Sequence, residues 1–172
     1  MKLASELKIP LVTVVDTPGA SLSKESEEGG LAGEIARSLA DQISLDAPTL
    51  CLLLGQGGGG GALAILPADR VIAAEHGWLS PLPPEGASVI VHRTIEFAAQ
   101  MAQEQGVRAK DLLAAGIVDR IVAERPDAAS EPEEFAKRVA QVLEHELIAL
   151  IDAEPADRLA NRLARYRNLG RK

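Results

Sequence analysis

Five consecutive glycines, Gly57–Gly61, follow closely on a continuous apolar run that ends at Leu54, and a short apolar segment comes next. A buried strand that stops in glycines and turns into a helix leaves backbone N–H groups without partners at the helix start. Because glycine has no Cβ, a ligand atom can approach that backbone closely. A flexible linker is the alternative, but apolar segments flank the run on both sides. The pattern favours a backbone site for a developing negative charge.

Two common glycine motifs do not account for this run. A phosphate loop of the GxxxxGK[ST] kind is excluded because no lysine followed by Ser or Thr comes after Gly61. The GxGxxG spacing of dinucleotide sites is present, but a run of glycines satisfies any glycine pattern and the match carries no information. An oxyanion hole remains, with expected N–H donors at the helix start from Gly60, Gly61 and Ala62.

A second group of donors is expected at Asp16-Thr-Pro-Gly-Ala20, which ends the strand predicted at 9–15. Parallel strands end on the same edge of a sheet, so this segment would lie beside the glycine run. Pro18-Gly19 alone reads as an ordinary turn, but together with the glycines it favours Gly19 and Ala20 as donors. Loss of one oxyanion donor typically lowers a rate by roughly 10²–10³.

Side chains offer less chemistry than the backbone. Ser80 and Ser88 lie in loop or helix-start positions without a GxSxG elbow. His76 is interpreted as a turn residue, and His92 as a surface or capping histidine rather than a base. Glu85 has a sufficient structural role at a helix N-terminus, where the helix dipole favours an acidic side chain.

The elements that must position these residues alternate along the chain. The pattern predicts a helix at 1–8, strands at 9–15, 49–54, 69–74 and 117–122, a partner segment at 78–80, and helices at 31–43, 61–66, 94–104, 108–114, 130–150 and 157–168. The first strand is expected to be buried on both faces, and residues 21–30 to form a mobile surface loop. The alternation indicates βαβ units with a mostly parallel sheet.

Composition excludes several classes of protein. The 172 residues suffice for one domain, and a net charge of −7 argues against nucleic acid or an anionic membrane as partner. Cys51 is the only cysteine, so no internal disulfide is possible, and three histidines without CxxC or HExxH spacing give no argument for a metal site. No apolar stretch reaches membrane-spanning length, and the charged start is unlike a signal peptide. We therefore expect a soluble, cytoplasmic protein.

The last two helices carry their own signals. Ser130 and Glu133 have the spacing of a capping box for the long helix. The final helix is basic, and a solvated or subunit-contacting face is the favoured interpretation, with an acidic partner as the alternative. Its cationic residues are Arg158, Arg162, Arg165, Arg167 and Arg171.

Several strings occur together and in order: VVDTPGA, GGLAGEIARSLA, GQGGGGGALAI, PEGAS and GIVDRIV. In this combination, over about residues 1–125, the chain closely resembles the α-type half of the acetyl-CoA carboxylase carboxyltransferase, a family of the crotonase superfamily. The resemblance implies a crotonase-like (ββα-superhelix) α/β half-domain at 1–125. Residues 126–172 would be a helical extension of the same domain.

The resemblance also implies transfer of a carboxyl group from carboxybiotin to the α-carbon of an acyl-CoA, with acetyl-CoA giving malonyl-CoA for fatty acid biosynthesis. Biotin would be held on a separate biotin carboxyl carrier protein, and each transferase half would supply one oxyanion hole. The α-type half faces biotin. The residues assigned to its hole by resemblance are Gly60, Gly61 and Ala62 with Gly19 and Ala20, and those placed near carboxybiotin are Gly58, Gly59, Glu85 and Gly86.

The chain departs from the family pattern in two places. The usual SPEG-like stretch is longer and richer in proline, at Ser80–Gly86, and the first strand and helix of a complete half are missing before Met1. We expect an N-terminally truncated half that is inactive until a β-type half joins it in a homo- or hetero-oligomer.

Three other functions remain open at this point. A crotonase-fold enoyl-CoA hydratase or isomerase would need an acid/base glutamate, for which Glu85 is the candidate. A ClpP-like serine protease would need a serine at the helix start, where this chain has glycine and alanine. A non-catalytic assembly half has no need of a bare glycine backbone.

Overall fold

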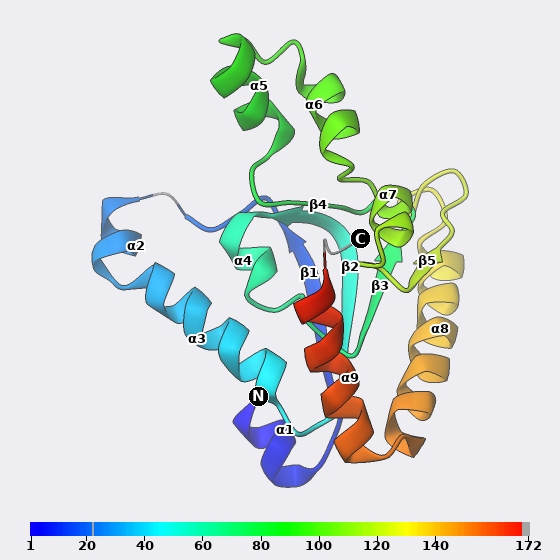
Figure 1. Ribbon diagram of the computed structural model, residues 1–172. Helices are drawn as coiled ribbons and strands as arrows, with labels where there is room; N and C mark the ends of the chain where they lie inside the picture. Colours follow the sequence, from blue (N-terminus) through cyan, green and yellow to red (C-terminus); the bar gives the residue numbers. More distant parts are fainter. Residues whose placement is uncertain (22, 170–172) are drawn as a thin grey trace.

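The β-branched and apolar segments form one parallel sheet in the computed structural model, which describes residues 1–21 and 23–169 (Figure 1). Its strands are β1 (Leu11–Thr17), β2 (Thr49–Gly58), β3 (Arg70–Ala74), β4 (Trp78–Ser80) and β5 (Arg120–Val122). The spatial order is β1-β2-β3-β5, and β4 pairs with the end of β2; each of these pairs is parallel. The expected α/β fold with a mostly parallel sheet is confirmed.

Helices cover both faces of this sheet. In chain order they are α1 (Lys2–Leu7), α2 (Lys24–Glu28), α3 (Leu31–Ser44), α4 (Gly59–Leu63), α5 (Pro84–His92), α6 (Ala98–Gln105), α7 (Ala109–Ala114), α8 (Pro132–Asp152) and α9 (Pro155–Asn168). Residues of α4 and α7 pack with one set of buried strand side chains, and α8 packs with the other set. In the described residues, no helix is long and apolar enough to cross a membrane.

The central strand β2 is apolar because both of its faces are covered. Cys51 and Leu53 point to the side of α4 and α7, whereas Leu50 and Leu52 pack beneath α8, and all four are buried. A parallel strand with helices on both sides has no solvated face, so alternation of polar and apolar residues is absent. The first five residues of β2 are therefore all buried, and the strand ends in the glycines.

The first strand differs from this expectation. The side chains of Val12 and Val14 are 38% and 52% exposed, so the prediction that β1 is buried on both faces is wrong. The physical reason is position: β1 is at the end of the strand order, and α8 packs on the strands further in. Only the opposite face of β1, with Val15, belongs to the core.

Three further expectations need correction. The segment 21–30 contains the short helix α2, whose first turn is capped by the Ser23 side chain, so it is not all loop, although Leu22 lies outside the described residues. The helix predicted at 61–66 is α4, which begins and ends earlier. The capping box at Ser130 does not form, since Ser130 bonds Asp127 and α8 begins at Pro132.

Helices α5 and α6 form an arm that stands clear of the sheet beyond β4 (Figure 1). They pack mainly on each other, and Ala87, Ser88 and Met101 are the buried residues of the two helices. Large apolar side chains of the arm remain 40–64% exposed, namely Leu82, Val89, Ile90, Val91, Ile95 and Phe97. An exposed apolar surface on one part of a protein is typical of an interaction site.

Candidate functional site

The glycine run places the end of β2 against the end of β1. A Cβ on Gly58 would lie 2.2 Å from the carbonyl oxygen of Pro18, a separation that no real side chain tolerates. Gly59, the first residue of α4, has a φ of +57°, in the left-handed region that favours glycine. These two glycines are therefore required by close backbone approach and by the turn itself.

The Pro-Gly-Ala segment lies directly over the start of α4. The hydroxyl of Thr17 accepts a hydrogen bond from the Gly19 amide at 3.3 Å and donates to the Gly19 carbonyl, which fixes this turn. A Cβ on Gly61 would lie 3.5 Å from the Ala20 nitrogen, and one on Gly59 would lie 3.8 Å from the Gly19 Cα. The structure therefore brings together Gly19, Ala20 and the run Gly58–Ala62. We call this region the glycine edge.

Several backbone amides at the glycine edge have no acceptor in the local hydrogen bonding. The first N–H groups of a helix have no acceptor within it. Among the turn and loop hydrogen bonds of residues 1–21 and 23–169, none engages the amide of Ala20, Gly60 or Gly61. Ala62 is the fourth residue of α4, and the amide at that position of a helix bonds the N-cap carbonyl. Asp16 fixes the strand ends differently, because its carboxylate accepts from the Gln56 amide at 2.9 Å. The arrangement can hold negative charge without any side chain.

Glu85 and Gly86 lie in the first turn of α5, a little apart from the glycines. Glu85 lines a pocket of about 400 Å³ that also contains Pro18 and Gln56, the residues next to the two halves of the glycine edge. Gly86 faces Leu82, 3.3 Å from where its Cβ would be. The sequence-predicted residues thus fall into one tight group around α4 and a neighbouring group at the start of the arm.

The candidate nucleophiles and bases have structural roles. Ser80 is buried and its hydroxyl donates to the Leu82 carbonyl at 2.6 Å, and the Ser88 hydroxyl donates to the Thr94 carbonyl. His92 is exposed and its ring lies 4.5 Å from that of Phe97. In the part of the chain that the structure describes, no group of three His, Cys, Asp or Glu side chains is placed to hold a metal ion.

His76 has a partner that sequence reasoning missed. Its Nδ1 lies 3.1 Å from a carboxylate oxygen of Glu124, and its amide donates to the other oxygen at 3.0 Å. Burial of the Glu124 carboxyl raises its pKa, but hydrogen bonds from the amides of His76 and Ala128 and from the His76 ring lower the pKa below its usual value on balance. The two residues are 48 positions apart, and no local pattern connects them.

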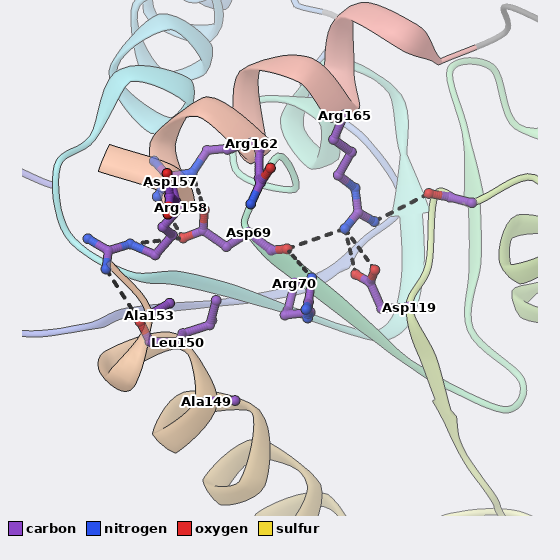
Figure 2. A pocket seen from close by; sticks show the side chains of 12 residues that line it. Asp69, Arg70, Asp119, Ala149, Leu150, Ala153, Asp157, Arg158, Arg162 and Arg165 are labelled. Atoms are coloured by element: carbon purple, nitrogen blue, oxygen red, sulfur yellow. Dashed lines mark hydrogen bonds and ion pairs between the residues drawn. The ribbon is translucent and has the colours of Figure 1, made fainter. Parts of the chain in front are cut away.

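A second pocket lies at the other end of the sheet, and arginines of α9 line it (Figure 2). Arg162 is fully buried and forms two hydrogen bonds to the Asp69 carboxylate, at 2.7 and 2.6 Å. Arg165 binds the Asp119 carboxylate at 2.7 Å, and Arg158 donates to the Asp46 carbonyl at 2.7 Å. We call these three arginines with their two carboxylate partners the arginine clamp.

The clamp corrects the interpretation of the basic helix. A solvated or subunit-contacting face is wrong for Arg158, Arg162 and Arg165, since their side chains are 6%, 0% and 15% exposed. Arg167 is exposed, as expected, and Arg171 lies outside the described residues. Because the clamp residues bind carbonyls and carboxylates of the chain itself, this pocket belongs to the scaffold.

Comparison with known proteins identifies the family of the chain. A family model described as acetyl co-enzyme A carboxylase carboxyltransferase-like matches residues 1–170. The chain belongs to this family. The resemblance drawn from the sequence motifs is confirmed.

Curated relatives extend well beyond the length of this chain. It is 58% identical over 170 residues to the probable biotin-dependent acyl-coenzyme A carboxylase beta3 subunit of Mycobacterium bovis, covering 99% of this chain and 34% of the relative. It is 37% identical over 171 residues to the acetyl-coenzyme A carboxylase carboxyl transferase subunit alpha of Pelodictyon phaeoclathratiforme, covering 99% and 51%. The chain therefore spans between a third and a half of these relatives.

Solved structures support the fold class. A Pseudomonas malonate decarboxylase hetero-tetramer in complex with malonate matches with a TM-score of 0.75 at 19% identity, covering 96% of this chain and 69% of that one. The transcarboxylase 12S hexamer with methylmalonyl-coenzyme A matches with a TM-score of 0.63 at 24% identity, covering 80% and 28%. The crotonase-like fold expected from the motifs is confirmed.

Proposed function

We propose that this chain is the biotin-facing half of a biotin-dependent acyl-CoA carboxyltransferase. The observation that carries the proposal is the set of backbone amides at the glycine edge, from Ala20, Gly60 and Gly61, that have no acceptor among the turn and loop hydrogen bonds. Family membership and the absence of a nucleophilic side chain at this edge support it. Preorganised amides stabilise a developing oxyanion at no reorganisation cost during the reaction.

The residues of the glycine edge suit the ureido group of carboxybiotin. In the overall reaction the carboxyl group leaves a biotin nitrogen, replaces a proton on the acyl-CoA α-carbon, and that proton returns to the nitrogen. The ureido oxygen gains negative charge as the carboxyl group leaves, and a donor set without side chains can approach a flat urea closely. Gly58 and Gly59 let the two loops pack, and Gly61 leaves open the space toward the Ala20 amide.

The wider assignment follows from the family. We propose acetyl-CoA as the acceptor and malonyl-CoA as the product, with biotin presented by a biotin carboxyl carrier protein in the cytoplasm. A β-type half would supply the thioester hole, and the apolar side chains of the α5–α6 arm are the surface that we assign to it. Residues 1–125 would form the catalytic part and residues 126–172 its helical extension.

The rival functions have weaker support in the geometry. A hydratase or isomerase needs an acid/base carboxyl in the pocket, and Glu85, the one carboxylate that lines it, is exposed. A ClpP-like protease needs a serine at the start of α4, where the chain has Gly59, Gly60 and Gly61. A purely structural half has no need for the amides that remain free.

The test uses the assembled two-half enzyme with Gly61→Val. The added methyl groups would project toward the Ala20 amide, and we expect transfer from malonyl-CoA to a biotin derivative to fall by roughly 10²-fold or more. Gly33→Val is the matched control, because Gly33 lies on the exposed side of α3. Gel filtration checks that both variants assemble. Unimpaired transfer by the assembled Gly61→Val enzyme contradicts the proposal.

A further inference from the structure

The 400 Å³ pocket beside the glycine edge holds polar groups that the oxyanion hole does not use. Its apolar walls are Trp78 and three prolines, and its polar lining comes from Gln56, His76, Glu85 and Arg108. A pocket of this volume, mainly apolar with a few converging polar groups, is typical of small-molecule sites. Pro18 in its wall directly precedes Gly19, so a ligand here is next to the proposed oxyanion hole.

Trp78 and Arg108 are held opposite each other by the backbone. They form an antiparallel bridge, with the Leu79 amide donating to the Val107 carbonyl and the Ala109 amide donating to the Gly77 carbonyl, each at 2.9 Å. Residues directly opposite in an antiparallel pair place their side chains on the same face, about 4.5–5.5 Å apart at Cβ. Trp78 and Arg108 therefore present their side chains on the same face of this wall, and both line the pocket.

The guanidinium of Arg108 is oriented with one edge free. Its Nε and Nη2 donate to the two carboxylate oxygens of Asp111 at 2.7 and 3.2 Å. This hydrogen bond lowers the pKa of Asp111 below its usual value and keeps the pair ionised. Among the described residues, Nη1 has no acceptor, and the side chain is 46% exposed. A carboxylate in the pocket would be a charge-assisted partner for Nη1.

The charged and ionisable side chains that line this pocket are Arg108, His76 and Glu85. His76 lines the same pocket, and because Glu124 engages its Nδ1, the Nε2 atom is the one left for a ligand. Glu85, at the start of α5, is the one carboxylate of the lining and repels an anion. Asp111 and Glu124 are already paired with Arg108 and His76.

Building on the proposed function, we infer that this pocket holds the bicyclic ring of carboxybiotin, with Trp78 packed against the ring and Arg108 positioning the carboxylate. The flat indole and the prolines suit an uncharged bicycle, and the free edge of Arg108 recognises the added carboxyl group. Arg108 and Trp78 thereby select the carboxylated form of the substrate, which the backbone amides of the glycine edge do not distinguish.

Binding can be measured without turnover because Trp78 is the only tryptophan of the chain. Carboxylated biotin methyl ester, titrated into the 172-residue chain, is expected to change the Trp78 fluorescence, with biotin methyl ester binding about tenfold or more weakly. Equal affinity for the two esters, or no change with either, contradicts the inference.

Substitutions assign the carboxylate contact. Arg108→Ala is expected to weaken binding of the carboxylated ester about 10- to 100-fold, the range for a charge-assisted hydrogen bond, and to leave the uncarboxylated ester unaffected. Glu85→Gln removes the opposing charge and is expected to tighten binding of the carboxylated ester. Arg37→Ala is the matched control, since Arg37 makes the same kind of exposed ion pair three residues from its partner, Glu34. A carboxylated-ester affinity unchanged in Arg108→Ala overturns the assignment.

Activity of the two-half enzyme separates this inference from the proposed function. With carboxylated biotin methyl ester and acetyl-CoA as substrates, Arg108→Ala should raise KM for the carboxylated ester with little change in kcat or in KM for acetyl-CoA, because the contact exists before and during transfer. Gly61→Val should instead lower kcat. A normal KM for the carboxylated ester in Arg108→Ala beside an impaired Gly61→Val contradicts the inference about the pocket and leaves the proposed oxyanion hole in place. Normal transfer by Gly61→Val removes the proposed function itself.

Discussion

The two ends of the parallel sheet are built in opposite ways. At the glycine edge, side chains are absent, and backbone amides of α4 and the Pro-Gly-Ala turn are left over. At the arginine clamp, Arg162 fills the space between loops and donates to the Leu45 and Ala47 carbonyls at 2.6 and 2.9 Å as well as to Asp69. One end leaves backbone amides for a ligand, and at the other end arginines bind carboxylates and loop carbonyls of the chain itself. Stability and chemistry are thus separated along the strands.

The largest expected effect is at the clamp. Arg162→Ala leaves the Asp69 carboxylate buried beside loop carbonyls that have lost their donor, and removing one partner of a buried pair costs about 3–5 kcal/mol. Denaturant unfolding measures this loss. Arg167→Ala, on the exposed side of the same helix, should change the free energy of unfolding by no more than about 0.5 kcal/mol. Equal effects of the two variants would show that α9 is not clamped.

A smaller effect is expected at the glycine edge. Gly58→Ala puts a methyl group against the Pro18 carbonyl and forces the two loops apart, at a cost of roughly 1–3 kcal/mol. Carboxyl transfer should fall much further than stability, because the donors move apart. Gly33→Ala lies within α3, where the new methyl group would meet only the Arg37 side chain at ordinary contact distance, and it should instead stabilise the chain by about 0.4–1 kcal/mol. Full carboxyl-transfer activity in Gly58→Ala would contradict the assignment of the chemistry to the glycine edge.

The smallest effect concerns the middle of β2, between the two ends. Burial raises the pKa of the Cys51 thiol from 9.0 to about 11, and a hydrogen bond with Thr13 lowers it by less. The folded chain holds this proton more tightly than the unfolded chain, so the stabilisation is full below pH 9 and is lost as the pH rises toward 11. We expect a loss of about 1.4 kcal/mol at pH 10.

Urea unfolding between pH 8 and pH 10 tests this slope. The Tyr166 pKa is also raised by burial and contributes in the same direction, so the Cys51 share is the difference between the chain and Cys51→Ala. A pH slope that is unchanged in Cys51→Ala would mean that the thiol is not sealed within the sheet.

Sequence patterns predicted what depends on local spacing. The apolar run of β2, the four-residue steps of α3 and the glycines at the start of α4 each carry their own signal. These elements form close to the predicted ranges, although β2 and α4 take in more of the glycine run than expected. The expectation that Gly19 and Ala20 lie against the glycine run is also confirmed, because the parallel strands β1 and β2 are adjacent and end together. The oxyanion role itself stays a prediction.

What the sequence did not predict depends on partners far away in the chain. Valine is a residue type common in buried strands, yet Val14 is exposed because β1 lies at the end of the sheet. Arg158, Arg162 and Arg165 lie at i, i+4 and i+7 on one face of α9, a spacing that fits a buried stripe as well as a solvated one. Their carboxylate and carbonyl partners were not visible in that spacing.

The clamp also constrains the order in which the chain can fold. Arg162 bonds Asp69 across 93 residues, Leu45 across 117 and Gln42 across 120. Contacts so distant in sequence form late and slow the folding rate, because a long loop must close before they are gained. During synthesis, β2 and β3 leave the ribosome well before α9 does. Until Arg162 arrives, the Asp69 carboxylate lacks its guanidinium and has the amide and hydroxyl of Thr49 as donors, so this end of the sheet is completed only by the last helix.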